Sequence, residues 1–319
     1  MKKLVITGGT GSLGRRLARY FSDAWRVVVF SRDEFKQFEM ADALPNVEFV
    51  LGDVRDERRV AEVFDGAEAV IHAAALKQAP PGEWQPDEYV KTNIEGTRNV
   101  VRAVETLKIP TLASISTCKA VAPLNLYGAT KLCADKFVVA AGVKLRGKQR
   151  LAVVRFGNFW GSRGSVLPYF LSRRGALPVT HPEMTRFSVT GEEAAETVKL
   201  ALSVAVGGEI FIPRSPTYRV GDLAAALGRP VETIGMRPGE KLHEEMLVAH
   251  DAPFTLAFGG HYIRVPRDLD EYRNVHGGNP VPENFSFVSS SNDHRLSIEN
   301  LRDLIRRYQE NAARYGDGF

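Results

Sequence analysis

The sequence predicts an α/β fold in which a doubly wound parallel sheet carries a smaller C-terminal cap. The first half of the chain alternates short β-branched runs with helix-length segments, which is typical of βαβ units on a parallel sheet. A glycine-rich loop follows the first of these runs. After Gly157 the alternation loosens and prolines become frequent. We therefore expect residues 1–157 to form the sheet domain and residues 158–319 mainly the cap, with some segments returning to the sheet.

Strands and crossover helices are expected in regular alternation along residues 1–157. The expected strands are Leu4–Thr7, Arg26–Phe30, Val47–Leu51, Ala69–His72, Leu112–Ser116 and Leu151–Phe156. The segments with helical spacing between them are Leu13–Ser22, Arg58–Phe64, Asp87–Leu107 and Leu126–Ala141. This number of strands and helices suffices for a doubly wound sheet. A last helix is expected from Ser297 to Tyr315, because Ser297 and Asn300 are suited to a helix start.

Composition excludes several classes of protein. The 319 residues are 44% hydrophobic and 25% charged, which is typical of a globular chain and not of a disordered one. The net charge of +4 is spread along the chain, so we expect anionic small ligands and no nucleic acid. Cys118 and Cys133 are too few for a disulfide framework or a cysteine zinc site, and no metal is expected. No apolar run reaches the ~18 residues that span a bilayer, so we expect a soluble, cytoplasmic protein without membrane contact.

The glycine-rich loop predicts a dinucleotide site. Thr7-Gly8-Gly9-Thr10-Gly11-Ser12-Leu13-Gly14 lies between the first expected strand and the first expected helix. Glycines allow a tight turn and a close approach of backbone N–H groups to a pyrophosphate, while the helix N-terminus offers unpaired donors. This context is the fingerprint of a Rossmann domain, and we expect Gly8, Thr10, Gly11, Ser12, Leu13 and Gly14 to bind the cofactor.

The end of the second expected strand favours NADP over NAD. An acidic residue there would accept a hydrogen bond from the ribose 2′-hydroxyl, but this chain has Ser31-Arg32, with Lys36 one turn later. The planar guanidinium of Arg32 suits a 2′-phosphate. Further cofactor contacts are expected after the third and fourth strands, from Asp53, Val54, Ala73, Ala74 and Ala75.

Tyr127 and Lys131 are the expected catalytic pair. They stand four residues apart at the start of a helix, so both side chains project from one face, and Thr117 precedes them at the end of a strand. A tyrosine with a pKa of ~10 is a poor base, yet a neighbouring ammonium and an oxidised nicotinamide favour its phenolate. The pair can then remove a hydroxyl proton while the same carbon is oxidised.

These features resemble the extended short-chain dehydrogenases/reductases. More narrowly, other segments resemble the inverting UDP-N-acetylglucosamine 4,6-dehydratases (5-epimerising) of pseudaminic acid biosynthesis. The segments are Ser31-Arg32-Asp33-Glu34, His72-Ala73-Ala74-Ala75-Leu76-Lys77-Gln78, Asn125-Leu126-Tyr127-Gly128-Ala129-Thr130-Lys131, Gly161-Ser162-Arg163-Gly164-Ser165-Val166, Met184-Thr185-Arg186-Phe187 and Arg237-Pro238-Gly239-Glu240-Lys241-Leu242-His243-Glu244. The resemblance implies bound NADP, UDP-N-acetylglucosamine as the substrate and a homo-oligomer.

The resemblance also implies the chemistry. Oxidation at C4 of the sugar acidifies the C5 proton, so that a base can form an enolate that expels the C6 hydroxyl once an acid protonates it. Return of the hydride to C6 then leaves a 4-keto-6-deoxy sugar. In the family an Asp-Lys pair after the threonine supplies the acid and the base. Here the run is Thr117-Cys118-Lys119. Thr117 is expected to bind the sugar and Lys119 to act as the C5 base, while Cys118 stands in place of the acid.

Cys118 leaves several outcomes open. Its thiol can donate a proton, although beside Lys119 it can instead become a thiolate. It can do the acid's work, or alter the product to an exocyclic alkene, as in the 5,6-dehydratases of the tunicamycin pathway, which have a similar Ser-Thr-Cys run. If elimination is lost, a UDP-N-acetylhexosamine 4-epimerase remains. An NADP-binding sensor without activity is the alternative of another class, which the Tyr-Lys pair disfavours.

The resemblance assigns substrate contacts as well. Asn158, Arg163 and Arg237 are expected at the diphosphate, because arginine and asparagine suit phosphate oxygens. Glu240 is expected at the uridine ribose. Lys77 follows the fourth strand, at the crevice formed by the carboxyl ends of the strands, and is expected to contact the sugar.

Overall fold

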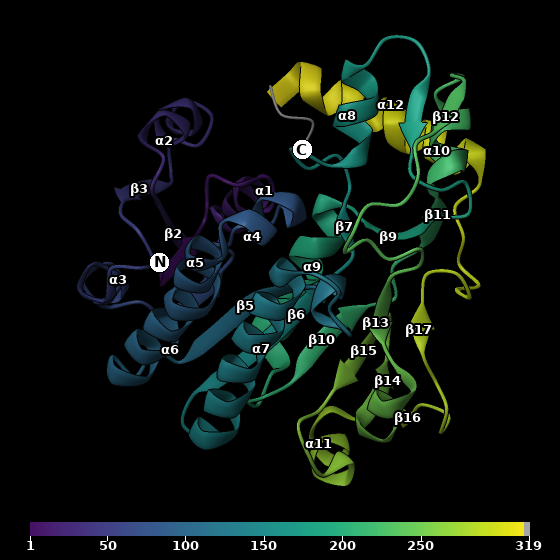
Figure 1. Cartoon of the computed structure of the whole chain (residues 1–319). Coiled ribbons are helices and arrows are strands. Elements are labelled where there is room, and N and C mark those ends of the chain that lie inside the picture. Colours follow the sequence, from purple (N-terminus) through teal and green to yellow (C-terminus); the bar gives the residue numbers. More distant parts are fainter. Residues whose placement is uncertain (316–319) are drawn as a thin grey trace.

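The computed structural model describes residues 1–315 and is built around a ten-stranded sheet (Figure 1). The strand order is β16-β14-β15-β10-β6-β5-β4-β1-β2-β3. The parallel strands are β1 (Lys3–Thr7), β2 (Arg26–Ser31), β3 (Glu48–Leu51), β4 (Ala69–His72), β5 (Thr111–Thr117), β6 (Arg150–Phe156) and β10 (Ile210–Pro213). The antiparallel edge consists of β15 (His261–Arg264), β14 (Thr255–Phe258) and β16 (Asn279–Pro280).

The direction of winding reverses beside β1. The chain runs outward from β1 through β2 to β3, then returns to pair β4 with the other side of β1 and continues through β5 and β6. Open α/β sheets bind ligands at such a switch point, outside the carboxyl ends of the strands. The predicted α/β fold with a doubly wound parallel sheet is confirmed, and its crevice lies at the end of β1.

Helices cover both faces of the sheet because successive strand residues point to opposite sides. Leu4 and Ile6 of β1 belong to one apolar layer, whereas Val5 belongs to the other. The first layer includes residues of α1 (Ser12–Phe21), α2 (Glu34–Ala41), α9 (Gly191–Val204) and α11 (Leu269–His276). The second includes residues of α3 (Glu57–Phe64), α6 (Gly96–Thr106) and α7 (Leu126–Leu145).

The expected helix over residues 87–107 is divided. Its place is taken by α5 (Pro86–Tyr89), the π-helical turn η1 (Val90–Glu95) and α6, preceded by α4 (Ala79–Trp84). The buried Asn93 lies in the π turn, where its side chain accepts a hydrogen bond from Leu76 N (2.8 Å) and donates to Leu76 O (3.0 Å). The turn therefore directs an amide side chain at the segment that follows β4.

The cap has its own apolar core, which includes Trp160, Phe170, Tyr218 and Leu301. The small sheets that follow residue 157 are β7 (Asn158–Phe159), β9 (Thr185–Val189) and β11 (Thr217–Arg219), and the pair β8 (Leu177–Val179) and β12 (Val231–Thr233). A further pair is β13 (Glu245–Leu247) and β17 (Phe287–Val288), whose buried Met246, Leu247 and Phe287 belong to the second apolar layer of the main sheet. The helices of the cap are α8 (Val166–Ser172), α10 (Val220–Ala226) and α12 (Ile298–Tyr315), and the short turns η2 (Cys118–Ala120) and η3 (Ala249–Phe254) lie outside it. Across residues 1–315, the helices are all too short or too polar to cross a bilayer.

Candidate active site

The glycine loop is shaped by close backbone approaches. Gly8 has φ +66°, and a Cβ there would lie 2.7 Å from the Ala74 backbone. A Cβ at Gly14 would lie 2.6 Å from Gly9 Cα. The residue that caps α1 is Gly11, which has no side chain to accept a hydrogen bond from the first N–H groups of the helix. These N–H groups therefore remain available to a ligand. A residue with a Cβ at position 8 or 14 would meet backbone atoms, so this loop conformation requires glycine at both positions.

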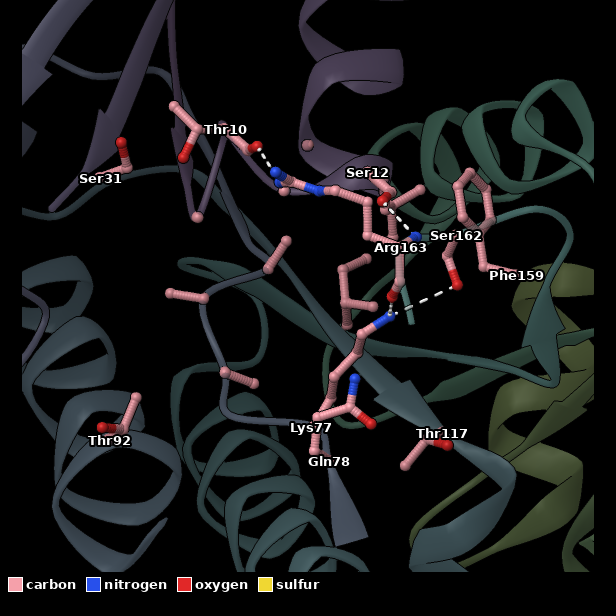
Figure 2. Close-up of a pocket in the computed structure, with 18 of the residues that line it drawn as sticks. Thr10, Ser12, Ser31, Lys77, Gln78, Thr92, Thr117, Phe159, Ser162 and Arg163 are labelled. Atoms are coloured by element: carbon pink, nitrogen blue, oxygen red, sulfur yellow. Dashed lines mark hydrogen bonds between the residues drawn. The ribbon is translucent and has the colours of Figure 1, made fainter. Parts of the chain in front are cut away.

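A cavity of about 560 Å³ lies along the carboxyl ends of the parallel strands (Figure 2). All the residues expected to bind the cofactor line it, from Gly8 to Gly14 through Ser31, Arg32, Lys36, Asp53 and Ala73–Ala75 to Tyr127 and Lys131, together with Val54. The catalytic candidates Thr117 and Lys119 also line it. In Figure 2, Thr117 lies far from Thr10 of the glycine loop. One cavity thus joins the expected dinucleotide contacts to the expected catalytic groups.

Charged side chains gather where the adenosine ribose is expected. Arg32 pairs with Asp53 (3.3 Å), and Asp53 also pairs with Arg55 (2.7 Å). Burial opposes ionisation of Asp53, but the hydrogen bonds and charges of the two arginines outweigh it and lower its pKa. Lys36 contacts Asp33. Both predicted phosphate-binding cations therefore already have acidic neighbours, with which a 2′-phosphate would compete.

Tyr127 and Lys131 lie in the first turns of α7, which Asn125 caps by accepting a hydrogen bond from Gly128 N (2.9 Å). Burial raises the pKa of Tyr127 to about 12, while the charge of Lys119 and a hydrogen bond with Thr117 oppose that rise. Lys131 Nζ donates to Ile115 O (2.7 Å), and burial lowers the pKa of Lys131. The cation whose charge most opposes the rise in the pKa of Tyr127 is Lys119. The role of Lys131 beside an oxidised nicotinamide stays a prediction.

In the Thr117–Lys119 segment, the side chains of Thr117 and Lys119 line the cavity and that of Cys118 does not. Cys118 is fully buried, and burial raises the pKa of its thiol to about 11. Lys119 reaches the cavity and pairs with the carboxylate of Glu244 (3.1 Å), which raises the pKa of Lys119 although burial opposes this. At neutral pH both groups hold their protons. The ammonium of Lys119 cannot take a proton from carbon in this state.

A segment of the cap crosses the cofactor end of the cavity (Figure 2). Arg163 donates from its backbone to Ser12 Oγ (3.1 Å) and from its guanidinium to Thr10 O (2.9 Å). Lys77 Nζ donates to Arg163 O (2.9 Å) and contacts Ser162 Oγ (3.4 Å). Arg163 and Lys77, which we expected at the substrate, thus connect the glycine loop to the segment after β4.

The remaining expected substrate residues divide into two groups. Asn158 lines the cavity. Arg237 and Glu240 lie outside it and pair with each other (3.8 Å), in a segment whose Gly239 O accepts a hydrogen bond from Asn125 Nδ2 (2.9 Å). This segment contacts the start of α7, so it lies beside the catalytic helix without lining the cavity.

A family model described as "Polysaccharide biosynthesis protein" matches residues 4–265, which include the glycine loop, the Tyr-Lys pair and most of the cap. The chain belongs to this family. Its motifs and fold place the chain among the extended short-chain dehydrogenases/reductases, as the sequence predicts.

Curated relatives of the chain include dehydratases and epimerases. The UDP-N-acetylglucosamine 4,6-dehydratase (inverting) of Campylobacter jejuni subsp. jejuni serotype O:2 is 40% identical, over 95% of this chain and 97% of the relative. A UDP-glucose 4-epimerase of Rickettsia bellii is 36% identical, over 95% of each chain. The structure of Pen from Bacillus thuringiensis covers 97% of this chain and 98% of its own, at 31% identity and a TM-score of 0.86. The predicted resemblance to this family of enzymes is confirmed.

A residue of the candidate site that the sequence analysis does not predict is Glu244. Its side chain is 2% exposed, and its carboxylate contacts the cations of Lys119 and Arg186. Glu244 ends the Arg237–Glu244 run that carries the resemblance, but nothing in its local pattern indicates a buried charge. The sequence indicates such a carboxylate only indirectly. A buried, cationic Lys119 needs a negative partner, and because position 118 is not acidic, that partner must come from elsewhere in the chain.

Proposed function

We propose that the protein is an NADP-dependent nucleotide-sugar dehydratase that converts UDP-N-acetylglucosamine to a 4-keto-6-deoxy sugar. The observation that carries this proposal is the single cavity in which Tyr127, Thr117 and Lys119 meet the glycine loop. The name of the Campylobacter relative supports the substrate and the reaction. We also propose that residues 1–157 bind the dinucleotide, that parts of residues 158–319 bind the UDP-sugar and that the enzyme is a homo-oligomer.

The residues of the cavity fit a nicotinamide dinucleotide. The cradle at Gly8 and Gly14 leaves room for a pyrophosphate where a Cβ would meet backbone atoms. Arg32 supports NADP, because its guanidinium can pair with a 2′-phosphate in two places. When bound, the dinucleotide supplies reversible oxidation and reduction of the sugar carbons.

Tyr127 is the group that we assign to the C4 hydroxyl. Its phenol must lose a proton before it can accept one from the sugar, and the charge of Lys119 favours that loss. Thr117 lies against Tyr127 and can donate a hydrogen bond to the same sugar oxygen. These residues together account for a ketone at C4, which makes the C5 proton acidic enough for elimination.

Elimination requires proton transfers at C5 and C6, for which Cys118 and Lys119 are the candidates. The leaving C6 hydroxyl needs a proton, and both side chains hold one in the resting site. Lys119 is also our assignment for the C5 base, which requires that its ammonium first be discharged. Because Cys118 lies outside the cavity, the protons at C5 and C6 depend chiefly on Lys119.

A second candidate is a UDP-N-acetylhexosamine 4-epimerase. It is favoured by the burial of Cys118 and the cationic state of Lys119, since C4 oxidation without elimination leaves a ketone that can be reduced from the other face. The name of the Rickettsia relative supports the same possibility.

One incubation distinguishes these functions. Purified protein is mixed with UDP-N-acetylglucosamine in deuterated water, and the products are analysed by mass spectrometry and NMR. Loss of one water with deuterium at C5 supports 4,6-dehydration, whereas an unchanged connectivity with inverted C4 supports the epimerase. Loss of water with an exocyclic alkene supports a 5,6-dehydratase. Recovery of unchanged substrate contradicts all three enzymes and favours the sensor.

A further inference from the structure

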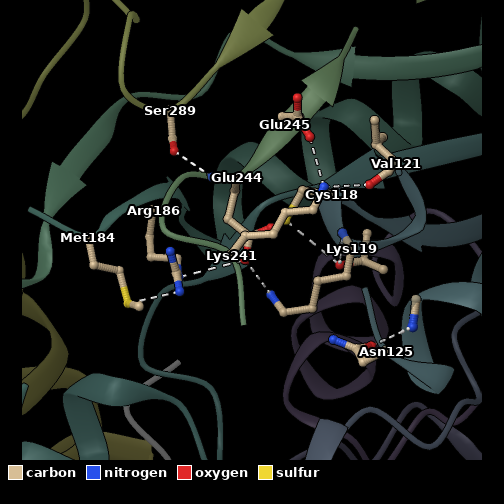
Figure 3. A network of polar contacts seen from close by, with 12 residues as sticks. Cys118, Lys119, Val121, Asn125, Met184, Arg186, Lys241, Glu244, Glu245 and Ser289 are labelled. Carbon is tan, nitrogen blue, oxygen red and sulfur yellow. Dashed lines mark hydrogen bonds and ion pairs between the residues drawn. The ribbon is translucent and has the colours of Figure 1, made fainter. Parts of the chain in front are cut away.

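A buried carboxylate joins the cap to the catalytic segment (Figure 3). Glu244 immediately precedes β13, and its Oε1 lies 3.1 Å from Lys119 Nζ and 3.7 Å from Arg186 Nε. The other oxygen, Oε2, is buried without a hydrogen-bond partner in residues 1–315. An anion buried this deeply is stable only beside compensating positive charge.

The backbone around Glu244 is fixed on both sides. Glu244 N donates to Ser289 Oγ (2.8 Å), and Ser289 N donates to Glu244 O (2.8 Å). Close by, Lys241 Nζ donates to Val121 O (2.7 Å) and pairs with Glu245 (2.8 Å). Two links therefore connect this segment to the residues around η2, one through Lys241 and one through Glu244.

The two cations beside Glu244 have different surroundings. The side chain of Arg186 is 10% exposed, and its guanidinium donates to Thr185 O (2.7 Å) and Leu242 O (3.2 Å). The side chain of Lys119 is 30% exposed and lines the cavity. Arg186 thus holds the carboxylate from within the cap, while Lys119 presents its charge to the space expected to hold the sugar.

We propose that Glu244 is a positioning residue of the active site, whose buried carboxylate fixes Lys119 as a cation beside Tyr127. This inference rests on the proposed function and deepens it. Glu244 acts through Lys119 and does not line the cavity itself. The working form of Lys119 at the oxidation step is the ammonium, whose charge favours the phenolate of Tyr127.

The electrostatics of the cluster agree with this geometry. Burial alone would lower the pKa of Lys119, but the charge of Glu244 outweighs burial and raises it. In return, Lys119 and Arg186 lower the pKa of Glu244 to about 2 although burial opposes this. The titratable and charged side chains that act on Lys119 or Glu244 from the surrounding elements are Cys118, Tyr127, Arg186, Tyr218 and Lys77.

The charge of Lys119 can be measured without turnover. The wild type and Glu244→Gln are treated with acetic anhydride between pH 7 and pH 10, and acetylation of Lys119 is followed by peptide mass spectrometry. We expect Glu244→Gln to raise the labelling rate of Lys119 at pH 8 by about tenfold or more, because each unit of pKa changes the neutral fraction tenfold. Glu245→Gln is the matched control, since it removes an acidic partner of Lys241 from the same segment, and we expect it to leave the labelling unchanged.

The pH dependence of turnover then tests whether Lys119 works as an ammonium at the oxidation step. We expect Glu244→Gln to lower kcat at pH 7 by about tenfold or more and to move the acidic limb of its profile to higher pH, because Tyr127 loses the charge that favours its phenolate. KM should change less than kcat, and Glu244→Asp should restore part of the rate.

Three outcomes would overturn the proposal. Equal labelling of Lys119 in the wild type and Glu244→Gln would show that Glu244 does not set its charge. A higher kcat in Glu244→Gln at pH 7 would show that Lys119 works as a neutral base, and an equal loss in Glu245→Gln would show a merely structural role. If the wild type converts no UDP-sugar, the proposed function fails, while the labelling result still decides the role of Glu244 toward Lys119.

Discussion

Replacing Arg32 by serine is expected to weaken the binding of NADP⁺ while leaving that of NAD⁺ unchanged. Arg32 lines the cavity directly after β2, where dinucleotide-binding sheets receive the adenosine ribose. NADP⁺ carries a phosphate at the ribose 2′ position, whereas NAD⁺ carries a hydroxyl there. The guanidinium can form charge-assisted hydrogen bonds with the phosphate, so its loss affects one cofactor selectively.

The size of the effect follows from the surroundings of Arg32. A hydrogen bond to a charged group contributes about 1.5–3 kcal/mol when it is well shielded, whereas an exposed ion pair contributes about 0.2–1 kcal/mol. The Arg32 side chain is 48% exposed and already pairs with Asp53. We therefore expect a loss of about 1–2 kcal/mol, which corresponds to about a tenfold increase in Kd for NADP⁺.

The measurement is a calorimetric titration of protein freed of bound dinucleotide, with NADP⁺ and NAD⁺ at two salt concentrations. Arg55→Ser is the matched control, because Arg55 pairs with the same Asp53 (2.7 Å) but does not line the cavity. In the wild type, the preference for NADP⁺ should decrease at higher salt as the charges are screened. Equal weakening of both cofactors by Arg32→Ser, or a wild type that prefers NAD⁺, would refute the reasoning.

Three further changes test the catalytic group, the sheet and the loop. Tyr127→Phe should lower kcat by about 10²–10⁴-fold with little change in KM, and an unaffected kcat in a product assay would exclude Tyr127 as the proton acceptor. Burial lowers the pKa of His72 to about 3, so the unfolded state binds a proton that the folded state does not, and the free energy of unfolding falls as the pH drops below about 6.5. Between pH 7 and pH 4.5, the decrease in the free energy of unfolding measured in urea should be about 3 kcal/mol smaller in His72→Gln than in the wild type. An equal decrease in both proteins would contradict this prediction. Gly14→Ala places a Cβ 2.6 Å from Gly9 Cα, so it should lower the free energy of unfolding by about 1–3 kcal/mol and weaken dinucleotide binding. Gly260→Ala is the control, because a Cβ there meets no atom within 4 Å. Equal melting temperatures of the two variants would contradict the prediction.

The parallel sheet could be predicted because its pattern is local. A buried parallel strand is a short apolar run, and β4 has the expected bounds, Ala69–His72. The glycine loop is also local, since the turn, the strand before it and the helix after it are adjacent in the chain. Its prediction needed no long-range contact, and its residues line the cavity together.

Helix α2 was not predicted because its apolar residues do not mark its buried face. Phe35 and Phe38 are 67% and 71% exposed, whereas Gln37 is buried. Gln37 is accommodated because its amide donates to Ser31 O (3.2 Å) and Val50 O (3.0 Å), across two strands. Such partners come from the sheet, so the amphipathic pattern of the helix alone cannot reveal which side is buried.

The charge of the catalytic groups could not be predicted from spacing. The four-residue interval between Tyr127 and Lys131 places both on one face of α7, but Lys131 donates to Ile115 O. The cation that acts most on Tyr127 is Lys119, and the anion that acts on Lys119 is Glu244. These groups come from different segments, which only the packing of the cap against the sheet brings together.

Glu244 supplies a negative charge beside Lys119, but it cannot donate the proton that the leaving C6 hydroxyl needs. A carboxylate with a pKa of about 2 carries no proton at neutral pH, so Glu244 cannot protonate a leaving hydroxyl. Three groups near Glu244 hold protons at neutral pH: the thiol of Cys118, the phenol of Tyr127 and the ammonium of Lys119. Tyr127 is assigned to the C4 hydroxyl, and of the other two only Lys119 lines the cavity. If Lys119 keeps its proton through turnover, elimination does not occur, and reduction of the C4 ketone from the other face epimerises the sugar. If Lys119 exchanges its proton with C5 and C6, water is lost. Under the proposed function, we therefore expect the strength of the Lys119–Glu244 pair in the presence of substrate to decide between the two reactions.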